Sequence, residues 1–203
     1  MNEFYNVRNI YLVRHCRPEV QDGIHLCIGK KDIPLSERGR EHAGQLKSYF
    51  LNHNLSSVYS SPLKRAKETA DIISDNKFRT MVRNDFAELD IGKWDGLTFD
   101  EIKQKYPEEY EDRGSNLENY IVEGGESMAM CRERAMAELH KTIDESEGNI
   151  LIVSHAGVIR TIISSLLHID IKDTFDYKIA YGNSSLLTFS NGILSLSKVD
   201  YKL

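Results

Sequence analysis

The sequence is poor in cysteine and contains no long apolar run. Three cysteines among 203 residues are an odd and sparse set, which predicts reduced thiols rather than a disulfide framework. No apolar stretch approaches the ~18 residues of a membrane span. Residues 1–8 lack a basic cap followed by an apolar core, so we do not expect a secretory signal there. These absences predict a cytoplasmic protein that does not enter a membrane.

Basic residues are outnumbered by acidic ones. The chain has 26 Lys and Arg against 31 Asp and Glu, a net charge of -5. This balance argues against nucleic acid or an anionic membrane as a partner. The excess is concentrated between Asp100 and Glu123, where eight residues are acidic and three are basic. We interpret this acidic segment as short helices broken by Pro107 and Gly114.

Apolar strands alternate with amphipathic helices along the chain. The length predicts one domain, because domains average ~150 residues, and no repeat or linker is evident. Helices are expected from Ser36, from Ser61-Pro62, from Gly124 to about residue 145, and from Gly157. Strands are expected at 9–13, 57–60, 80–83, 149–154, 185–190 and 193–199. The last two flank Asn191-Gly192, a hairpin turn, so we predict an α/β fold with a mainly parallel sheet and an antiparallel edge hairpin.

Several polar residues stand at or just beyond the ends of expected strands. They are Arg14, His15, Arg65, Glu88 and His155. In an open parallel sheet such positions line one crevice. Arginine forks bind phosphoryl oxygens, a neutral histidine is a nucleophile, and a protonated carboxyl group can donate to a leaving alkoxide. The set therefore predicts phosphoryl transfer, without a nucleotide-binding P-loop or a paired-carboxylate metal site.

Each of these residues also has an ordinary structural explanation. His15 is consistent with a buried core histidine, the arginines with surface ion pairs, and Glu88 with a solvated loop. His155 is harder to explain in this way, because Gly157 follows it and opens a helix N-terminus, a natural anion site. A chance placement of one such residue at a strand end is common, but a chance placement of all of them there is much less expected.

Six segments of the chain, in order, resemble the motifs of the histidine phosphatase superfamily, in the branch of phosphoglycerate mutases and related small-molecule phosphatases. They are Leu12-Val13-Arg14-His15, residues 29–39, residues 60–70, residues 88–96, Gly124-Gly125-Glu126-Ser127 and Val153-Ser154-His155-Ala156-Gly157. Each motif alone is moderately specific, whereas six in order over residues 10 to about 190 are very specific.

The resemblance implies a role for each matching residue. His15 would be the nucleophile, and Arg14, Arg65 and His155 would hold the phosphate. Glu88 would protonate the leaving oxygen and then help to activate water. No metal and no cofactor would be required. The family fold is a three-layer α/β/α sandwich, so residues 1–203 would form one domain, with an acidic cap insertion at about 97–123.

The sequence departs from the family pattern after the nucleophile. Cys16 replaces the usual glycine, and Pro18 replaces a frequent threonine. Gln21 stands where the family often has an asparagine that contacts phosphate, so we expect Gln21 to bind phosphate through a longer arm. Cys16 has two interpretations. It is a thiolate activated by neighbouring arginines, or it is buried and inert.

The substrate is expected to be a small phosphate monoester. Phosphoglycerate mutases usually carry a longer insertion and tail, so the chain favours hydrolysis over mutase-type transfer, which stays an alternative. An acidic cap would disfavour bisphosphates. Cys-Ile-Gly at 27–29 and Asp-Ile-Pro-Leu at 32–35 are similar to α-ribazole phosphatases, which implies α-ribazole 5'-phosphate; a sugar phosphatase or broad monoesterase remains open.

Three other interpretations remain. The first is that the three tyrosines of the acidic segment, Tyr106, Tyr110 and Tyr120, offer an aromatic surface to a base or sugar; ordinary packing is the other explanation. The second is a zinc site, although its residues lack close Cys-x-x-Cys pairs: Cys16, His25, Cys27 and His42. The third is a module that binds phosphate ligands without catalysis, against which the His15 and Glu88 pair argues. The oligomeric state stays open.

Overall fold

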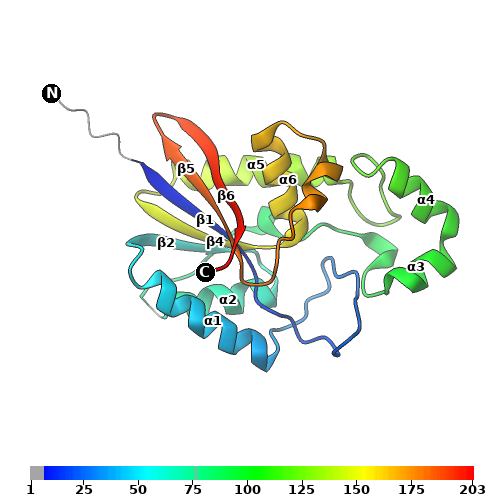
Figure 1. Ribbon diagram of the computed structural model, residues 1–203, viewed down its shortest axis with the longest axis horizontal. Coiled ribbons are helices and arrows are strands. Elements are labelled where there is room, and N and C mark those ends of the chain that lie inside the picture. Colours follow the sequence, from blue (N-terminus) through cyan, green and yellow to red (C-terminus); the bar gives the residue numbers. More distant parts are fainter. Residues whose placement is uncertain (1–6, 76) are drawn as a thin grey trace.

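The protein is built on a single twisted sheet. In the computed structural model, which describes residues 7–75 and 77–203, six strands form this sheet. They are β1 (Arg8–Arg14), β2 (Leu55–Ser60), β3 (Met81–Val82), β4 (Asn149–Ser154), β5 (Ser184–Ser190) and β6 (Ile193–Tyr201). Their order is β3-β2-β4-β1-β5-β6 (Figure 1). The four strands from β3 to β1 are parallel, while β5 and β6 are antiparallel to their neighbours, as predicted.

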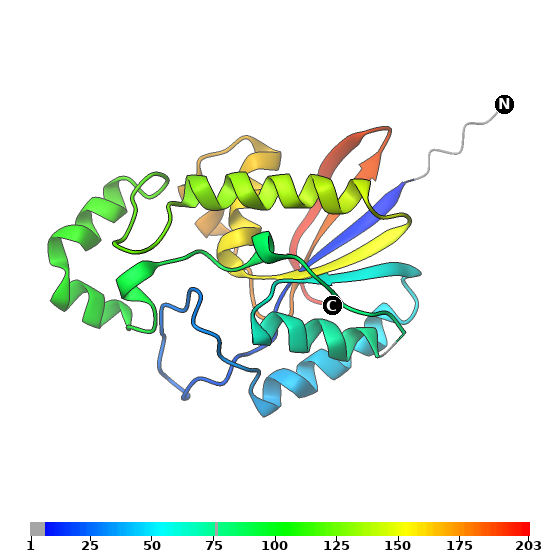
Figure 2. The same ribbon diagram turned by 180° about the vertical axis from the view of Figure 1, so that it is seen from behind.

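Helices cover both faces of the sheet (Figures 1 and 2). They are α1 (Glu37–Phe50) and α2 (Lys64–Ser74) on one face, and α5 (Met128–Asp144) and α6 (Ala156–Leu167) on the other. Successive side chains of β1 alternate between the two layers. Tyr11 and Val13 pack with the α1 and α2 core, whereas Ile10 and Leu12 pack with the α5 and α6 core. This arrangement is the predicted three-layer α/β/α sandwich.

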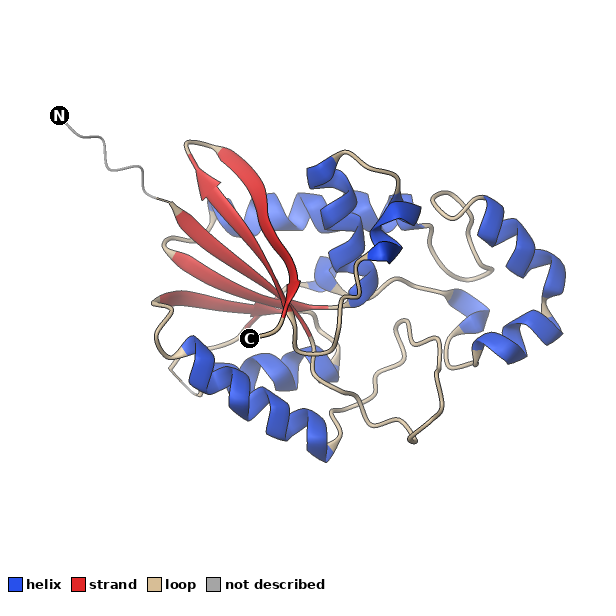
Figure 3. Cartoon of the chain, viewed as in Figure 1, coloured by secondary structure: helices blue, strands red, loops and turns tan. Residues whose placement is uncertain are grey.

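Two short helices lie outside the sandwich, at one end of the molecule (Figure 3). They are α3 (Phe99–Lys105) and α4 (Pro107–Ser115), and Thr98 and Glu101 form a capping box at the start of α3. Pro107 separates the helices as expected, but Gly114 lies inside α4. The three tyrosines of the segment pack on a separate apolar cluster around Trp94. The structure therefore places them in ordinary packing.

Local signals at the element ends were mostly interpreted correctly. Ser36 caps α1, since its hydroxyl accepts from the Gly39 amide at 3.1 Å. Asn191 and Gly192 adopt φ of 54° and 75°, the left-handed pair that a two-residue hairpin needs. The predicted start of α2 at Ser61-Pro62 was wrong, because this helix begins at Lys64. The Ser61 hydroxyl is instead engaged by a histidine of the candidate site.

Three short 3₁₀ segments complete the described elements. They are η1 (Asn84–Phe86), η2 (Gly92–Trp94) and η3 (Ile171–Asp176). Within the described residues, no helix is both long and apolar enough to cross a bilayer. The expectation about a secretory signal concerns residues 1–8, of which residues 1–6 lie outside the described part of the chain.

Candidate active site

His15 lies where β1 ends, beside the end of β4. Its backbone N–H donates to the Ser154 carbonyl at 2.9 Å, and the residue is only 4% exposed. The Nδ1 atom is 2.7 Å from the Cys16 carbonyl oxygen, and Nε2 is 3.2 Å from Nε of Arg65. Because an arginine N–H can only donate, Nε2 of His15 must accept. The proton of the neutral ring therefore sits on Nδ1, and Nε2 carries a lone pair.

The surroundings of His15 also keep the ring uncharged. Burial is the main cause that lowers the pKa of His15 well below its usual range. The positive charges of Arg14 and Arg65 lower the pKa of His15 further, and the hydrogen bond to Cys16 opposes them. At neutral pH the site thus presents a neutral imidazole whose free nitrogen lies among cations.

Arg65 is held rigidly in the first turn of α2. It is 1% exposed, and its Nη1 and Nη2 atoms donate to the carbonyls of Lys31 and Gly29, each at 2.7 Å. A Cβ on Gly29 would stand 2.7 Å from the Leu89 carbonyl oxygen, so only glycine fits between the two loops. The guanidinium is therefore positioned by backbone groups before any ligand arrives.

Arg14 is held by an aromatic ring and one carbonyl. Its Cζ lies 3.8 Å from the ring centroid of Tyr181, within cation–π range, and Nη1 donates to the Ile179 carbonyl at 2.7 Å. Tyr181 was not identified from the sequence, because no motif marks it. The Nε atom of Arg14 is buried and has no hydrogen-bond partner in the described structure.

His155 precedes α6 and faces His15. The two ring centroids are 5.0 Å apart, and His155 is 0% exposed. Its Nε2 lies 2.7 Å from the Ser61 hydroxyl, whereas Nδ1 is buried with no partner among the described residues. Buried polar atoms without partners are rare in native structures. Two of the six such side-chain atoms among the described residues, those on Arg14 and His155, belong to side chains next to His15.

Glu88 approaches the same strand ends from the loop after η1. Its Oε1 accepts from the Leu89 amide at 2.9 Å, and Oε2 accepts from the Gly157 amide at 3.3 Å. A Cβ on residue 157 would stand 2.5 Å from Oε1, so a larger residue there would push the Glu88 carboxyl group away from the helix. The carboxyl group therefore lies against the N-terminus of α6, held by two backbone amides.

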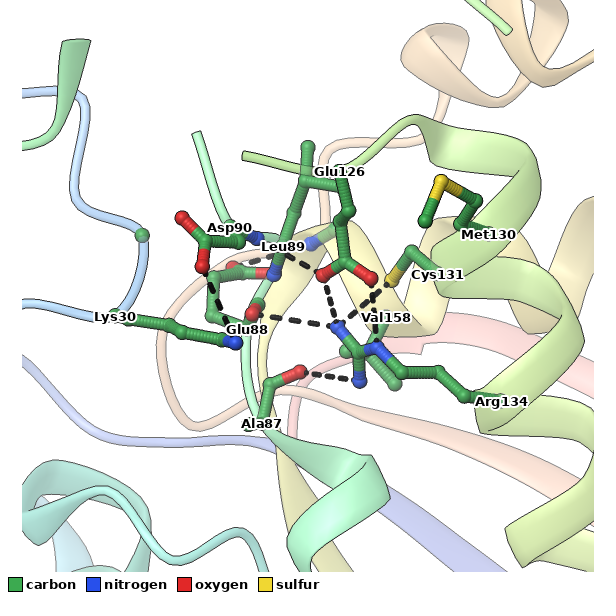
Figure 4. Close-up of polar contacts among 12 residues, drawn as sticks. Lys30, Ala87, Glu88, Leu89, Asp90, Glu126, Met130, Cys131, Arg134 and Val158 are labelled. Atoms are coloured by element: carbon green, nitrogen blue, oxygen red, sulfur yellow. Dashed lines mark hydrogen bonds and ion pairs between the residues drawn. The ribbon is translucent and has the colours of Figure 1, made fainter. Parts of the chain in front are cut away.

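Arg134 of α5 supports the segment that carries Glu88 (Figure 4). Its guanidinium donates to the carbonyls of Ala87 at 2.8 Å and Glu88 at 3.3 Å. It also binds both carboxylate oxygens of Glu126, at 2.9 and 2.6 Å. Glu126 in turn accepts from the Asp90 amide at 2.9 Å. Glu126 lies in the matched segment at 124–127, but no role for it or for its arginine partner was predicted from the sequence.

Two cavities open beside these side chains. The Arg14 cavity, of about 370 Å³, is lined by Arg14, Tyr181 and part of the loop that follows β1. The Glu88 cavity, of about 190 Å³, is lined on its polar side by Glu88, Arg113 and Arg160. Ile28 lines both cavities. Pockets for drug-sized ligands have ~300–1,000 Å³, so both spaces suit a small metabolite.

Two groups of predicted ligand-binding residues do not converge. Gln21 is exposed and does not line the Arg14 cavity, so its contact with phosphate stays a prediction. In the part of the chain that the structure describes, no three His, Cys, Asp or Glu side chains form a cluster suited to a metal ion. The four residues of the zinc alternative are therefore not brought together.

Of the two interpretations of Cys16, the structure supports the buried core residue. It is 0% exposed and packs in the α1 and α2 core. Burial raises the pKa of the Cys16 thiol to about 12. The contact with the Thr69 side chain opposes this effect, but loss of solvation outweighs it. Its φ is not positive, so the backbone does not need the family's glycine at this position.

The buried thiol leads to a chemical prediction. Iodoacetamide should leave Cys16 unmodified in the native protein and should leave phosphatase activity intact, because the reagent attacks thiolates. Peptide mass spectrometry before and after denaturation measures the modification. Cys27, half-buried and with its pKa raised to about 11, serves as the internal comparison. Inactivation that parallels Cys16 alkylation and is prevented by phosphate would contradict the prediction.

Comparison with known proteins decides the family. The family model for the histidine phosphatase superfamily (branch 1) matches residues 10–201. The chain belongs to this superfamily. The predicted family, the predicted fold and the predicted enzyme class, that of the histidine phosphatases, are thereby confirmed.

Individual relatives of this histidine phosphatase differ in substrate. Phosphoserine phosphatase 1 of Hydrogenobacter thermophilus is 30% identical over 170 residues, covering 83% of this chain and 80% of the relative. A 6-phosphofructo-2-kinase/fructose-2,6-bisphosphatase of Caenorhabditis elegans is 32% identical over 81% of this chain, which spans only 35% of that protein. The structure of an α-ribazole phosphatase from Shigella flexneri superimposes with a TM-score of 0.83 at 23% identity, covering 95% and 96% of the two chains.

Proposed function

We propose that this histidine phosphatase is a metal-independent phosphomonoesterase that works through a phosphohistidine at Nε2 of His15. The observation that carries the proposal is the orientation of His15. Its Nδ1 proton is directed to the Cys16 carbonyl, so Nε2 carries the lone pair, which accepts a hydrogen bond from Nε of Arg65 until a phosphoryl group takes the place of that donor. Attack by Nε2 forms an N–P bond and breaks the ester P–O bond.

The positive groups around His15 would hold the phosphoryl group during this transfer. Arg65 has an Nε–H directed at the reacting nitrogen, and Arg14 and His155 have buried polar atoms with no protein partner. Arginine N–H groups would stabilise the charge that spreads over the phosphoryl oxygens. Gln21 would contact phosphate only if its loop moved toward the site, because its side chain is exposed.

Glu88 would handle the protons of both steps. Protonated, it would donate to the leaving oxygen as the ester bond breaks. As a carboxylate, it would then accept a proton from the water that attacks phosphohistidine, which releases inorganic phosphate and restores His15. The amide of Gly157 orients its Oε2 at the strand ends.

The choice among activities on this fold follows from the same residues. A module that only binds phosphate has no use for a fixed nucleophilic tautomer beside a carboxyl group, so we favour catalysis. Mutase-type transfer remains the alternative activity. We also propose that residues 1–203 form one catalytic domain, with α3 and α4 as a cap over its cavities. The name of the Shigella flexneri neighbour keeps α-ribazole 5'-phosphate among the substrates to test.

A panel of phosphate monoesters, assayed with excess chelator, tests the proposed function. Arg14 and Arg65 already supply a positive field at His15, so activity should survive chelation. Vanadate should inhibit, because its trigonal-bipyramidal adducts resemble the transferring phosphoryl group. Loss of activity on chelation and its recovery with zinc or magnesium would overturn the metal-independent mechanism.

A further inference from the structure

The Glu88 cavity contains two arginines that the proposed mechanism does not use. Arg113 comes from α4 and Arg160 from α6, and both line the cavity together with Glu88. Because Glu88 would protonate the leaving oxygen, the alcohol part of the substrate would occupy this cavity. The two guanidinium groups therefore face the leaving group rather than the transferring phosphoryl group.

Arg113 has unused binding capacity. It is half-buried, yet it donates no hydrogen bond and forms no ion pair within the described residues. Its Cζ lies 5.9 Å from the ring centroid of Trp94. Burial lowers the pKa of Arg113, and Cys27 and Tyr110 oppose this effect. The five N–H donors of the guanidinium are thus available to a ligand in the cavity.

Arg160 is fixed in place but only partly used. Its Nη1 donates to the Thr174 carbonyl, and its Cζ lies 4.4 Å from the ring centroid of Phe175. Arg160 forms no ion pair among the described residues. Its remaining N–H groups are available at the cavity wall. The other residues that line the cavity are largely apolar and include Leu89 and Met128. An anion bound there would be poorly solvated and therefore strongly attracted to the two guanidinium groups.

The acidic residues of the cap do not cancel this field. None of them lines the Glu88 cavity. Glu109 and Glu123 bind Lys93, Glu118 binds Arg132, and Glu101 serves the cap of α3. The negative charge of the segment is thus neutralised locally or exposed, while its Arg113 faces the cavity. The expectation that an acidic cap disfavours highly anionic substrates does not apply at this wall.

We propose that Arg113 and Arg160 form a subsite for a second anionic group, a carboxylate or a second phosphate, on the alcohol part of the substrate. The proposal rests on the proposed phosphatase function and specifies its substrate class. A charge-assisted contact of this kind contributes about 10- to 100-fold in binding. The small volume of the cavity restricts the alcohol part to a few carbon atoms between the two anions.

Matched substrate pairs test the subsite. Glycerol 3-phosphate and 3-phosphoglycerate differ only in a hydroxymethyl group against a carboxylate, and fructose 6-phosphate and fructose 1,6-bisphosphate differ in a second phosphate. The wild type should prefer the anionic member of at least one pair in kcat/KM, and the pair concerned identifies the anion. In Arg113→Met this preference should fall by about 10- to 100-fold. The preference of Arg113→Lys should lie between those of the wild type and Arg113→Met, because lysine keeps the charge but lacks the planar guanidinium fork.

Lys103→Met provides the matched control. Lys103 is an exposed cation of α3 in the same acidic segment, and it does not line the cavity. This variant should keep the wild-type preference. Equal losses on both members of each pair in Arg113→Met would show that Arg113 only packs on Trp94, and would overturn the subsite.

The two proposals fail in different ways. Hydrolysis of an aryl phosphate through phosphohistidine, without preference for either anionic substrate, would overturn the subsite and leave the phosphatase function standing. Absence of any hydrolysis would overturn the function. In that case calorimetry on His15→Ala still decides the subsite, because binding needs no turnover. If neither anionic substrate binds more tightly than its matched partner, the subsite is rejected.

Discussion

Replacement of His15 by alanine should reduce hydrolysis of nitrophenyl phosphate by ~10³-fold or more, because no other group can form the covalent intermediate. Acid-labile, base-stable label from phosphate-labelled substrate should appear on the wild type and not on the variant. His140→Ala is the matched control, since His140 is exposed on α5, and it should behave as wild type. Residual turnover within tenfold of wild type in His15→Ala would reject the assignment.

The acidic side of the pH profile gives an independent check on the state of His15. Its folded pKa lies below the usual value of 6.5, so the ring stays neutral as the pH falls through 6.5. Formation of phosphohistidine in a single turnover should therefore show no loss centred near pH 6.5. Any change near pH 6 should follow the second pKa of the substrate phosphate, ~6. A loss of phosphohistidine formation centred at pH 6.5 with every substrate would contradict the prediction, because it would show that His15 titrates like a solvated histidine.

Replacement of Glu88 by glutamine should damage hydrolysis according to the leaving group. An alkyl phosphate expels a basic alkoxide, so loss of the proton donor should lower its turnover by ~10²–10⁴-fold. A nitrophenolate leaves readily without a proton, so the turnover of nitrophenyl phosphate should fall much less. Glu108→Gln changes an exposed carboxyl group of α4 and should leave both rates unaltered. Equal losses on the two esters, with phosphohistidine formation limiting both, would exclude Glu88 as the general acid.

The position of the candidate site could be predicted because it depends on topology more than on detail. Arg14 and His15 end one apolar strand and His155 follows another, and the carboxyl ends of parallel neighbours meet at one edge of a sheet. Recognising two strands was therefore enough to place the two histidines together. The partners of these side chains were not predictable, since Ser61, Tyr181 and Arg134 come from segments whose approach depends on the packing of the whole chain.

Charge arguments from the sequence left open what burial decides. Cys16 had two interpretations, a thiolate activated by arginines and a buried thiol, and its burial raises the pKa of the thiol to about 12. The acidic segment was expected to disfavour highly anionic substrates, yet the side chain that it places on the wall of the Glu88 cavity is Arg113. Both cases have one cause. A charge count along the chain contains no information about which side chains face solvent and which are desolvated.

The sequence by itself determined the α/β class and the hairpin at Asn191-Gly192, because apolar periodicity and turn chemistry are local properties of the chain. Its resemblance to the histidine phosphatases implied the three-layer arrangement and grouped His15 with Arg14, Arg65, Glu88 and His155. The tertiary structure alone decided the tautomer of His15, the close approach of Glu88 to Gly157, the burial of Cys16 and the position of Arg113 and Arg160 on the wall of one cavity. Each of these depends on an atom supplied by a distant segment, at a distance that only the packed chain defines.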